Sequence, residues 1–223
     1  MSSLADRTMD YFETLARLTR EASATDHTGQ PKTLADGIAD FITRGRAAHH
    51  AGNKLIFIGN GASASMASHY ALDFTKNGGI RSLAFSDASM LTALVNDIGG
   101  DAIFAEQIGF YAQPGDILVA ISSSGSSPNI LKAVERARAA ECSVITFSGF
   151  APDNPLRLSG DLNFHVAGDE YGFVETAHAA LIHAIIDLSL GWGTAEDRNP
   201  GALKRRRAAD AAETKAPAHS RQR

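Results

Sequence analysis

Short apolar runs that alternate with helical stretches constrain the fold of this sequence more than any other feature. The runs at 54–58 and 116–121 are typical, since each is too short for a buried helix and lies beside turn residues. Strands that alternate with helices in this way predict a doubly wound α/β fold, a parallel sheet with helices on both faces. The five predicted strands cover residues 54–58, 81–85, 116–121, 143–147 and 162–166.

Apolar residues at helical spacing fill the stretches between and around these runs. Two predicted helices precede the first strand and need a surface to pack on, which their own domain or a second subunit would supply. The predicted helices cover residues 4–22, 33–51, 62–76, 88–96, 102–112, 127–140 and 173–192.

Length and charge divide the 223 residues into three parts. We predict an N-terminal helical arm at 1–50, the α/β domain at 51–194 and a disordered basic tail at 195–223. The tail has eight Lys and Arg against four Asp and Glu, and too few apolar residues to offset the cost of ordering. Its cations at 204–207 could contact RNA, lipid headgroups or an acidic partner, but a solubilising role is the favoured interpretation.

Composition excludes several classes of protein. No apolar run reaches the roughly 18 residues of a transmembrane helix, and the N-terminus shows no secretory signal. The single cysteine, Cys142, leaves no intramolecular disulfide and fits a reducing compartment. The net charge of −4 makes no case for nucleic acid. We therefore predict a cytoplasmic protein with no membrane partner and no nucleic-acid partner.

The turn after the first predicted strand reads GNGASA, at residues 59–64. It matches the pattern G-x-G-x-x-A, and with Asp87 after the second strand it could mark a dinucleotide site. The match is short, because any strand-to-helix turn with close backbone packing selects glycine.

The turn after the third predicted strand reads ISSSGSSPN, at residues 121–129, and opens a helix. It brings serine hydroxyls to a helix N-terminus, where unsatisfied N–H groups carry partial positive charge. A phosphate monoester would satisfy these donors. The alternative is a flexible loop in which Ser126 or Ser127 is a simple N-cap. No lysine follows, which argues against a nucleoside triphosphate.

Together these segments resemble the sugar isomerase (SIS) domain family. The likeness runs from about residue 4 to residue 192 and rests on three segments, GNGASA, SDASMLTALVNDIG and ISSSGSSPNILKAVERAR. Within the family it is greatest for the phosphoheptose isomerases, which interconvert sedoheptulose 7-phosphate and a heptose 7-phosphate. The resemblance implies a flavodoxin-like sheet and a phosphosugar aldose–ketose isomerase.

The resemblance also assigns residues to the substrate. It gives the first turn to the sugar, which implies that no nicotinamide cofactor is needed. Asn60 and Ser63 would contact sugar hydroxyls, with Asp97 nearby. The residues that would hold the phosphate are Ser122, Ser123, Ser124 and Ser127.

Isomerisation through an enediol needs an acid, a base and a group that stabilises the oxyanion. His69 and Asp73 share one helix face at i and i+4, while Glu175 and His183 lie on the last helix. An unpartnered imidazole would be costly in the apolar stretch around His183, which favours a functional role for it as a metal ligand or proton-transfer residue. His178, on the same helix, could instead face solvent or the core.

The four residues would form a divalent-metal site of the zinc type, and the resemblance assigns zinc to the same set: His69, Asp73, Glu175 and His183. Glu175 and His183 are eight residues apart, about 12 Å along a straight helix. To share a metal they need long reach, a helix that begins after Glu175, or a neighbouring subunit.

Two of these positions depart from the phosphoheptose isomerases, which have Glu where Asp73 stands and Gln where Glu175 stands. Asp is shorter by one methylene, and catalytic groups are sensitive to displacements of about 1 Å. Two interpretations of the catalytic base follow. Either Asp73 is the base despite its shorter reach, or the carboxylate function has moved to Glu175.

Two other functions compete with the isomerase. A non-catalytic SIS module would bind a phosphosugar or a protein partner such as a replication initiator, and would not require His183. A nicotinamide-dependent dehydrogenase would use Asp87 for the ribose but leaves the serine loop unexplained. The resemblance favours a homotetramer with sites between subunits.

Overall fold

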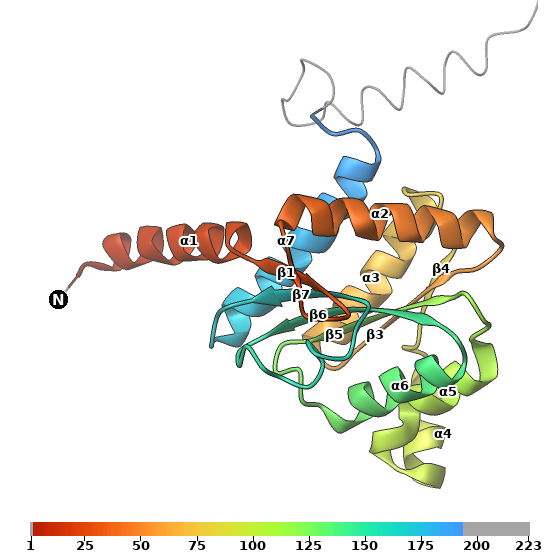
Figure 1. Cartoon of the computed structure of the whole chain (residues 1–223). Helices are drawn as coiled ribbons and strands as arrows, with labels where there is room; N and C mark the ends of the chain where they lie inside the picture. The colour runs from red at the N-terminus through yellow and green to blue at the C-terminus, as the bar shows by residue number, and fades with distance from the viewer. Residues whose placement is uncertain (1, 194–223) are drawn as a thin grey trace, which may run out of the picture.

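Seven strands form one sheet in the order β2-β1-β7-β6-β5-β3-β4 in the computed structural model, which describes residues 2–193 (Figure 1). Helices lie above and below this sheet. The strands are β1 Ser23–Asp26, β2 Pro31–Lys32, β3 Leu55–Gly59, β4 Ser82–Ala84, β5 Ile117–Ser122, β6 Ser143–Gly149 and β7 Leu162–Val166.

The five predicted strands, β3 to β7, are all parallel. Their order places β3 beside β5, with β4 on one side and β6 and β7 on the other. This is the order of a flavodoxin-like, doubly wound sheet, so the predicted fold class is confirmed. Strand order reverses between β3 and β5, and ligands bind in such sheets at the carboxyl ends of the strands that flank this point.

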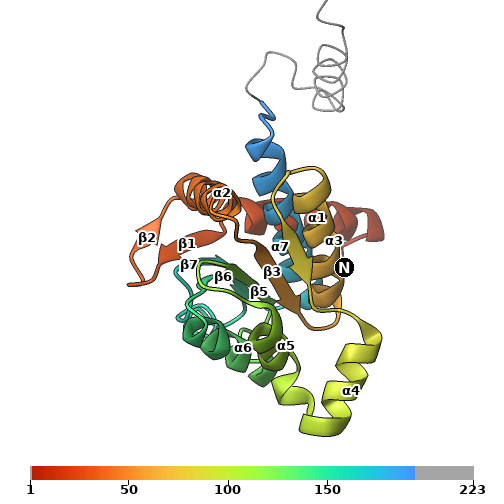
Figure 2. The ribbon, with the colours of Figure 1, turned by 90° about the vertical axis from the view of Figure 1, so that its right-hand side faces the viewer.

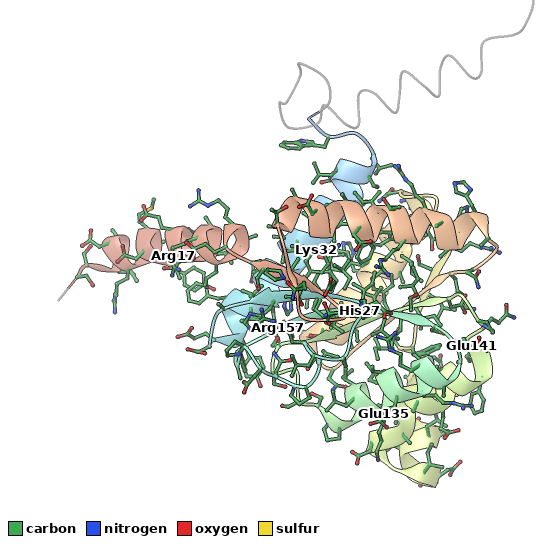
Figure 3. The ribbon with its side chains drawn as sticks, viewed as in Figure 1. Arg17, His27, Lys32, Glu135, Glu141 and Arg157 are labelled. Atoms are coloured by element: carbon green, nitrogen blue, oxygen red, sulfur yellow. The ribbon has the colours of Figure 1, made fainter. Side chains whose placement is uncertain are left out.

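The hairpin of β1 and β2 was not predicted. β1 is short and polar, and it pairs antiparallel with β7, so that Ser23 lies opposite His165. Its turn, marked by His27 in Figure 3, is held by Asp26, whose Oδ1 accepts a hydrogen bond from the Thr28 N–H at 2.8 Å. This strand forms because it pairs with β7, about 140 residues away in the chain. The local sequence pattern carries no information about that pairing, so it does not predict the strand.

The helices cover both faces of the sheet, as Figure 2 shows from the side. On one face α2, α3 and α7 enclose a core that includes Phe41 and Phe74, and on the other α5 and α6 enclose a second core around Ile108 and Ile130. The helices are α1 Leu4–Arg20, α2 Leu34–His50, α3 Ala62–Lys76, α4 Ala88–Ile98, α5 Ile103–Tyr111, α6 Pro128–Ala139 and α7 Tyr171–Ser189.

Helix α1 extends away from the sheet (Figure 1). It rests on α7 through Tyr11 and Phe173, whose ring centroids are 4.5 Å apart. Helix α2 lies directly on the sheet, where Phe41 is fully buried. None of the described helices is long and apolar enough to span a membrane. The predicted basic tail at 195–223 lies outside the described residues.

Candidate functional site

The turn between β3 and α3 needs glycine at two positions. A Cβ on Gly59 would lie 2.6 Å from the backbone of Ser63, and Gly61 adopts a φ of +55° as the N-cap of α3. No side chain caps this helix. The tight turn therefore brings the uncapped N-terminus of α3 to the carboxyl end of β3.

The serine loop between β5 and α6 also ends at an uncapped helix. Ser127 is the N-cap of α6, yet its side chain makes no capping hydrogen bond, and Pro128 begins the helix. The Ser127 Oγ lies 3.5 Å from the Ser122 Oγ instead. The N–H groups of Ile130 and Leu131 donate to the Ser127 carbonyl, both at 3.1 Å, so among the described residues the Asn129 N–H is the one in the first turn of α6 that remains available to a ligand.

An amide pair joins the two turns. Asn60 and Asn129 exchange two hydrogen bonds, each 2.9 Å long, between their side-chain amide groups. Because α3 and α6 lie on opposite faces of the sheet, this pair bridges the point where strand order reverses. It fixes the spacing of the two turns without any charged group.

A pocket of about 140 Å³ lies between these turns. The side-chain oxygen of Ser123, a residue only 5% exposed, is buried there without a hydrogen-bond partner among the described residues. A buried hydroxyl without a partner is costly, and this one lies at the wall of a pocket, where a ligand can supply the partner. The pocket is lined by Asn60, Ser63, Ile121, Ser122, Ser123, Ser124, Ser127, Tyr171 and Glu175.

Helix α7 contributes the only acidic side chain of this lining. Glu175 is half-buried one turn into α7 and forms no ion pair within residues 2–193. The pocket therefore combines several neutral hydroxyl donors with one carboxylate. This is a suitable arrangement for a substrate that carries a phosphate at one end and a transferable proton at the other.

A second group of polar side chains lies on the outer surface of α3 and α7. The Asp73 Oδ2 is 3.3 Å from the His69 Nε2 and 3.9 Å from the His183 Nδ1. One ligand atom from each of these residues lies within 4.8 Å of the other two. Two imidazoles and a carboxylate at this spacing fit a zinc-type ion, as three protein ligands with room for a fourth.

The buried Tyr70 packs against this group from the protein interior. Its hydroxyl donates to the Ala179 carbonyl at 2.8 Å, which ties α3 to α7, and its ring lies 5.0 Å from that of His183. Burial, and then the nearby Asp73 carboxylate, raise the pKa of the Tyr70 hydroxyl, so it stays neutral.

Glu175 does not join this group in one chain. Helix α7 begins at Tyr171, before Glu175, so a late helix start does not bring Glu175 and His183 together. Asp97 also stands apart. It lies near the end of α4, where it accepts a hydrogen bond from the Asn96 amide at 2.8 Å, and it does not line the pocket. The predicted residues therefore lie in two places, the serine pocket and the α3–α7 group of His69, Asp73 and His183, and Asp97 lies outside both.

Two residues flagged in the sequence have structural partners. His178 faces the core, where its Nε2 donates to the Ser148 carbonyl at 2.9 Å, and burial lowers its pKa to about 4. Asp87 caps α4 by accepting from the Met90 N–H at 2.8 Å.

Sequence reasoning missed Tyr171 and Asn129 as parts of the site. Asn129 follows Pro128 inside the serine motif, so its proximity to the loop was a usable signal. Tyr171 lies about 50 residues further on, and only the return of α7 to the sheet edge brings it to the pocket.

Comparison with known proteins defines the family. The profile of the SIS domain matches residues 10–149, more than half of the chain. The phosphoheptose isomerase of Trichlorobacter lovleyi is 35% identical over 161 residues, which cover 70% of this chain and 82% of that protein.

Solved structures give the same result. The phosphoheptose isomerase of Neisseria gonorrhoeae is 28% identical with a TM-score of 0.73, over 84% of this chain and 99% of that one. The enzyme from Francisella tularensis is 26% identical with a TM-score of 0.73, over 84% of this chain and 98% of that one.

The fold and the turns at its switch point define an SIS domain protein, and the chain belongs to the SIS domain family. Within that family, the relatives and structures described above are phosphoheptose isomerases. They support the class of enzyme expected from the sequence, a phosphosugar isomerase.

Proposed function

We propose that this protein is an aldose–ketose isomerase that converts sedoheptulose 7-phosphate to a heptose 7-phosphate. The observation that carries the proposal is the buried, unpartnered Ser123 hydroxyl beside the uncapped N-terminus of α6. Relatives named phosphoheptose isomerase, about 35% identical, support this substrate.

The serine end of the pocket would hold the phosphate. Four hydroxyls and the Asn129 N–H at the start of α6 supply donors without a lysine, so binding relies on hydrogen bonds and on the helix dipole. The phosphate set is Ser122, Ser123, Ser124 and Ser127. Asn60 and Ser63, on the opposite turn, would then meet the sugar hydroxyls.

The α3–α7 group would hold a zinc ion through His69, Asp73 and His183. When bound there, zinc supplies a Lewis acid that polarises a sugar oxygen. The geometric fit of two imidazoles and one carboxylate supports this assignment.

Proton transfer between the two sugar carbons requires a base and an acid. Glu175 is the base favoured by its place in the pocket, and Asp73 is the competing one. His183 is a zinc ligand in this scheme; in the alternative, in which it does not bind the metal, it moves a proton between the enediol oxygens, since an imidazole can donate or accept near neutrality.

We also propose a homotetramer with active sites between subunits. Within one chain, Glu175 lies near the start of α7 and does not join His69, Asp73 and His183, and Asp97 lies apart from both sites. A neighbouring subunit would bring such groups together. The protein would work in the cytoplasm, where its buried Cys142, whose thiol pKa burial raises to about 11, stays reduced.

The test is incubation of the purified protein with sedoheptulose 7-phosphate, with and without zinc, followed by detection of the product sugar phosphate. We expect turnover that a chelator removes and zinc restores. If no phosphosugar is converted under any metal condition, the protein is a binding module.

Variants then separate the two ends of the site. Replacing Ser124 and Ser127 with Ala should weaken substrate binding by about 1–3 kcal/mol for each hydrogen bond lost. Glu175→Gln should reduce turnover at least about 100-fold if Glu175 is the base, with a smaller effect of Asp73→Asn. The reverse order would make Asp73 the base, and wild-type turnover in both and in His183→Ala would contradict the mechanism.

A further inference from the structure

The end of β6 and the segment that follows it are hydrogen-bonded to the serine loop. Gly149 donates its N–H to the Ser123 carbonyl at 2.9 Å, and Leu156 donates to the Gly125 carbonyl at 2.9 Å. Leu156 is fully buried in the core beneath α6, which anchors this segment. Residues 149–156 therefore hold two carbonyl groups of the loop, one on each side of Ser124.

These two bonds determine where the loop's N–H groups point. In a planar trans peptide the C=O and N–H groups point in opposite directions, and the described residues contain no cis peptide. When the Ser123 and Gly125 carbonyls face the segment behind, the N–H groups of Ser124 and Ser126 face away from it. The Ser126 N–H lies 3.4 Å from the Ser124 hydroxyl, which lines the pocket.

Asn154 occupies the space behind Gly125. A Cβ on Gly125, whose φ is +63°, would lie 1.9 Å from the Asn154 Oδ1, so only glycine allows this close contact. Asn154 is 3% exposed. Its amide group donates to the Gly149 and Ala151 carbonyls at 3.0 and 2.8 Å and lies 3.2 Å from the Ser148 Oγ.

The side-chain carbonyl of Asn154 also has a partner. Its Oδ1 accepts a hydrogen bond from the Arg157 N–H at 2.9 Å. Arg157, labelled in Figure 3, holds the same segment to β1 by donating to the Ser23 Oγ at 3.2 Å, and braces the segment internally by donating to the Pro152 carbonyl at 2.7 Å. Asn154 is thus the centre of a hydrogen-bond network that braces the segment on which the serine loop rests.

We propose that Asn154 is a positioning residue that aims the N–H groups of the serine loop at the substrate phosphate, without contacting the phosphate itself. The proposal rests on the phosphate-binding role proposed above for the serine loop. A buried amide is suited to this task, because it holds several backbone groups at once and adds no charge beside an anion.

The test compares Asn154→Ala with Asn163→Ala. Asn163 is a similarly buried asparagine on β7 that bonds to Thr146 and Gly160 and makes no hydrogen bond to the serine loop among the described residues. Both variants should lose stability, so each is measured well below its own melting temperature. Binding of inorganic phosphate is measured by calorimetry, and KM and kcat with the sugar phosphate.

We expect Asn154→Ala to weaken phosphate binding and raise KM about tenfold or more, with a smaller change in kcat, since misplacement by about 1 Å has effects of this size. Asn163→Ala should bind phosphate as the wild type does. Equal losses in both variants, or unchanged binding in Asn154→Ala, would overturn the proposal.

If Asn154→Ala does not fold, Asn154→Leu replaces it. Leu is similar in size, cannot donate to the Gly149 and Ala151 carbonyls and adds no charge beside the phosphate, so the same loss of phosphate binding is expected, and unchanged binding would again overturn the proposal. A wild-type protein that binds no phosphate would contradict the proposed function itself and this inference with it.

Discussion

His178 is buried completely on α7, with one nitrogen bonded to Ser148 and the other without a partner among the described residues. Burial lowers its pKa from 6.5 to about 4. Between these values the unfolded chain binds a proton that the folded chain does not, so folding stability falls as the pH falls below 6.5. Nearby His165 acts in the same direction, because burial and then Arg157 lower its pKa.

Lowering the pH from 7 to 5 should therefore cost about 2 kcal/mol of unfolding free energy through His178 alone. Denaturant titrations at the two pH values measure this. His178→Gln, which does not titrate, should lose less stability over this range than the wild type, whereas His50→Gln on the exposed end of α2 should behave like the wild type. Identical pH dependence in all three proteins would contradict the prediction.

Residues of the serine pocket were predictable because their signals are local. The serine loop and the GNGASA turn each follow a strand recognisable from a few residues, and parallel strands bring their carboxyl ends to one edge. Asn154 was not predictable. An Asn-Pro pair in a loop is typical of a plain turn, and only the folded chain places this one behind Gly125.

At the scale of elements, β3 and β5 are joined at the edge opposite the site by Asp116, which is fully buried. Its carboxylate accepts from the N–H groups of Lys54 and Gln113 at 3.0 and 2.8 Å, and pairs with the Lys54 ammonium. These bonds fix the register of the two strands whose other ends form the pocket.

Asp116→Ala should lower the unfolding free energy by about 3 kcal/mol or more, because it leaves buried donors and the Lys54 charge without their partner. Phosphate affinity should be unchanged, since the substitution lies at the far end of the strands. Denaturant unfolding and phosphate calorimetry measure the two effects. The control is Asp101→Ala, which removes an exposed ion pair with Lys132 and should cost less than about 1 kcal/mol. Equal costs for both would contradict the prediction.

The contrast between β5 and β1 explains which elements the sequence predicts. β5 is buried along its whole length, so nearly all of its residues are apolar. This continuous apolar run predicts the strand without knowledge of its neighbours. β1 buries only Ala24 and depends on pairing with β7. An edge strand of this kind has no periodicity of its own and becomes visible only with its partner.

At the scale of the whole molecule, α1 is a helix that one chain leaves with large apolar side chains exposed. Its inner face packs on α7 and the core through Tyr11 and Leu15. Leu4 and Phe12, which lie beyond this contact, are 73% and 60% exposed, and Met9 is also exposed. Exposed apolar groups on a projecting helix are typical of an interaction surface, and the tetramer proposed above would cover them.

We expect the wild-type protein to be a tetramer by light scattering, and Met9→Glu with Phe12→Glu to form smaller species, because buried charges at a subunit contact are costly. Asp10→Lys, on the side of α1 that carries Thr14 and Arg17, is the matched control and should keep the wild-type mass.

Turnover decides whether the contact also completes the active site. If residues from two subunits form each site, the dissociated variant loses isomerase activity but still binds inorganic phosphate, because the serine pocket belongs to one chain. A dissociated variant with full activity would place the whole site within one subunit. A wild-type protein that stays monomeric at every concentration would contradict the assembly itself, and α1 would then need a different partner for its outer face.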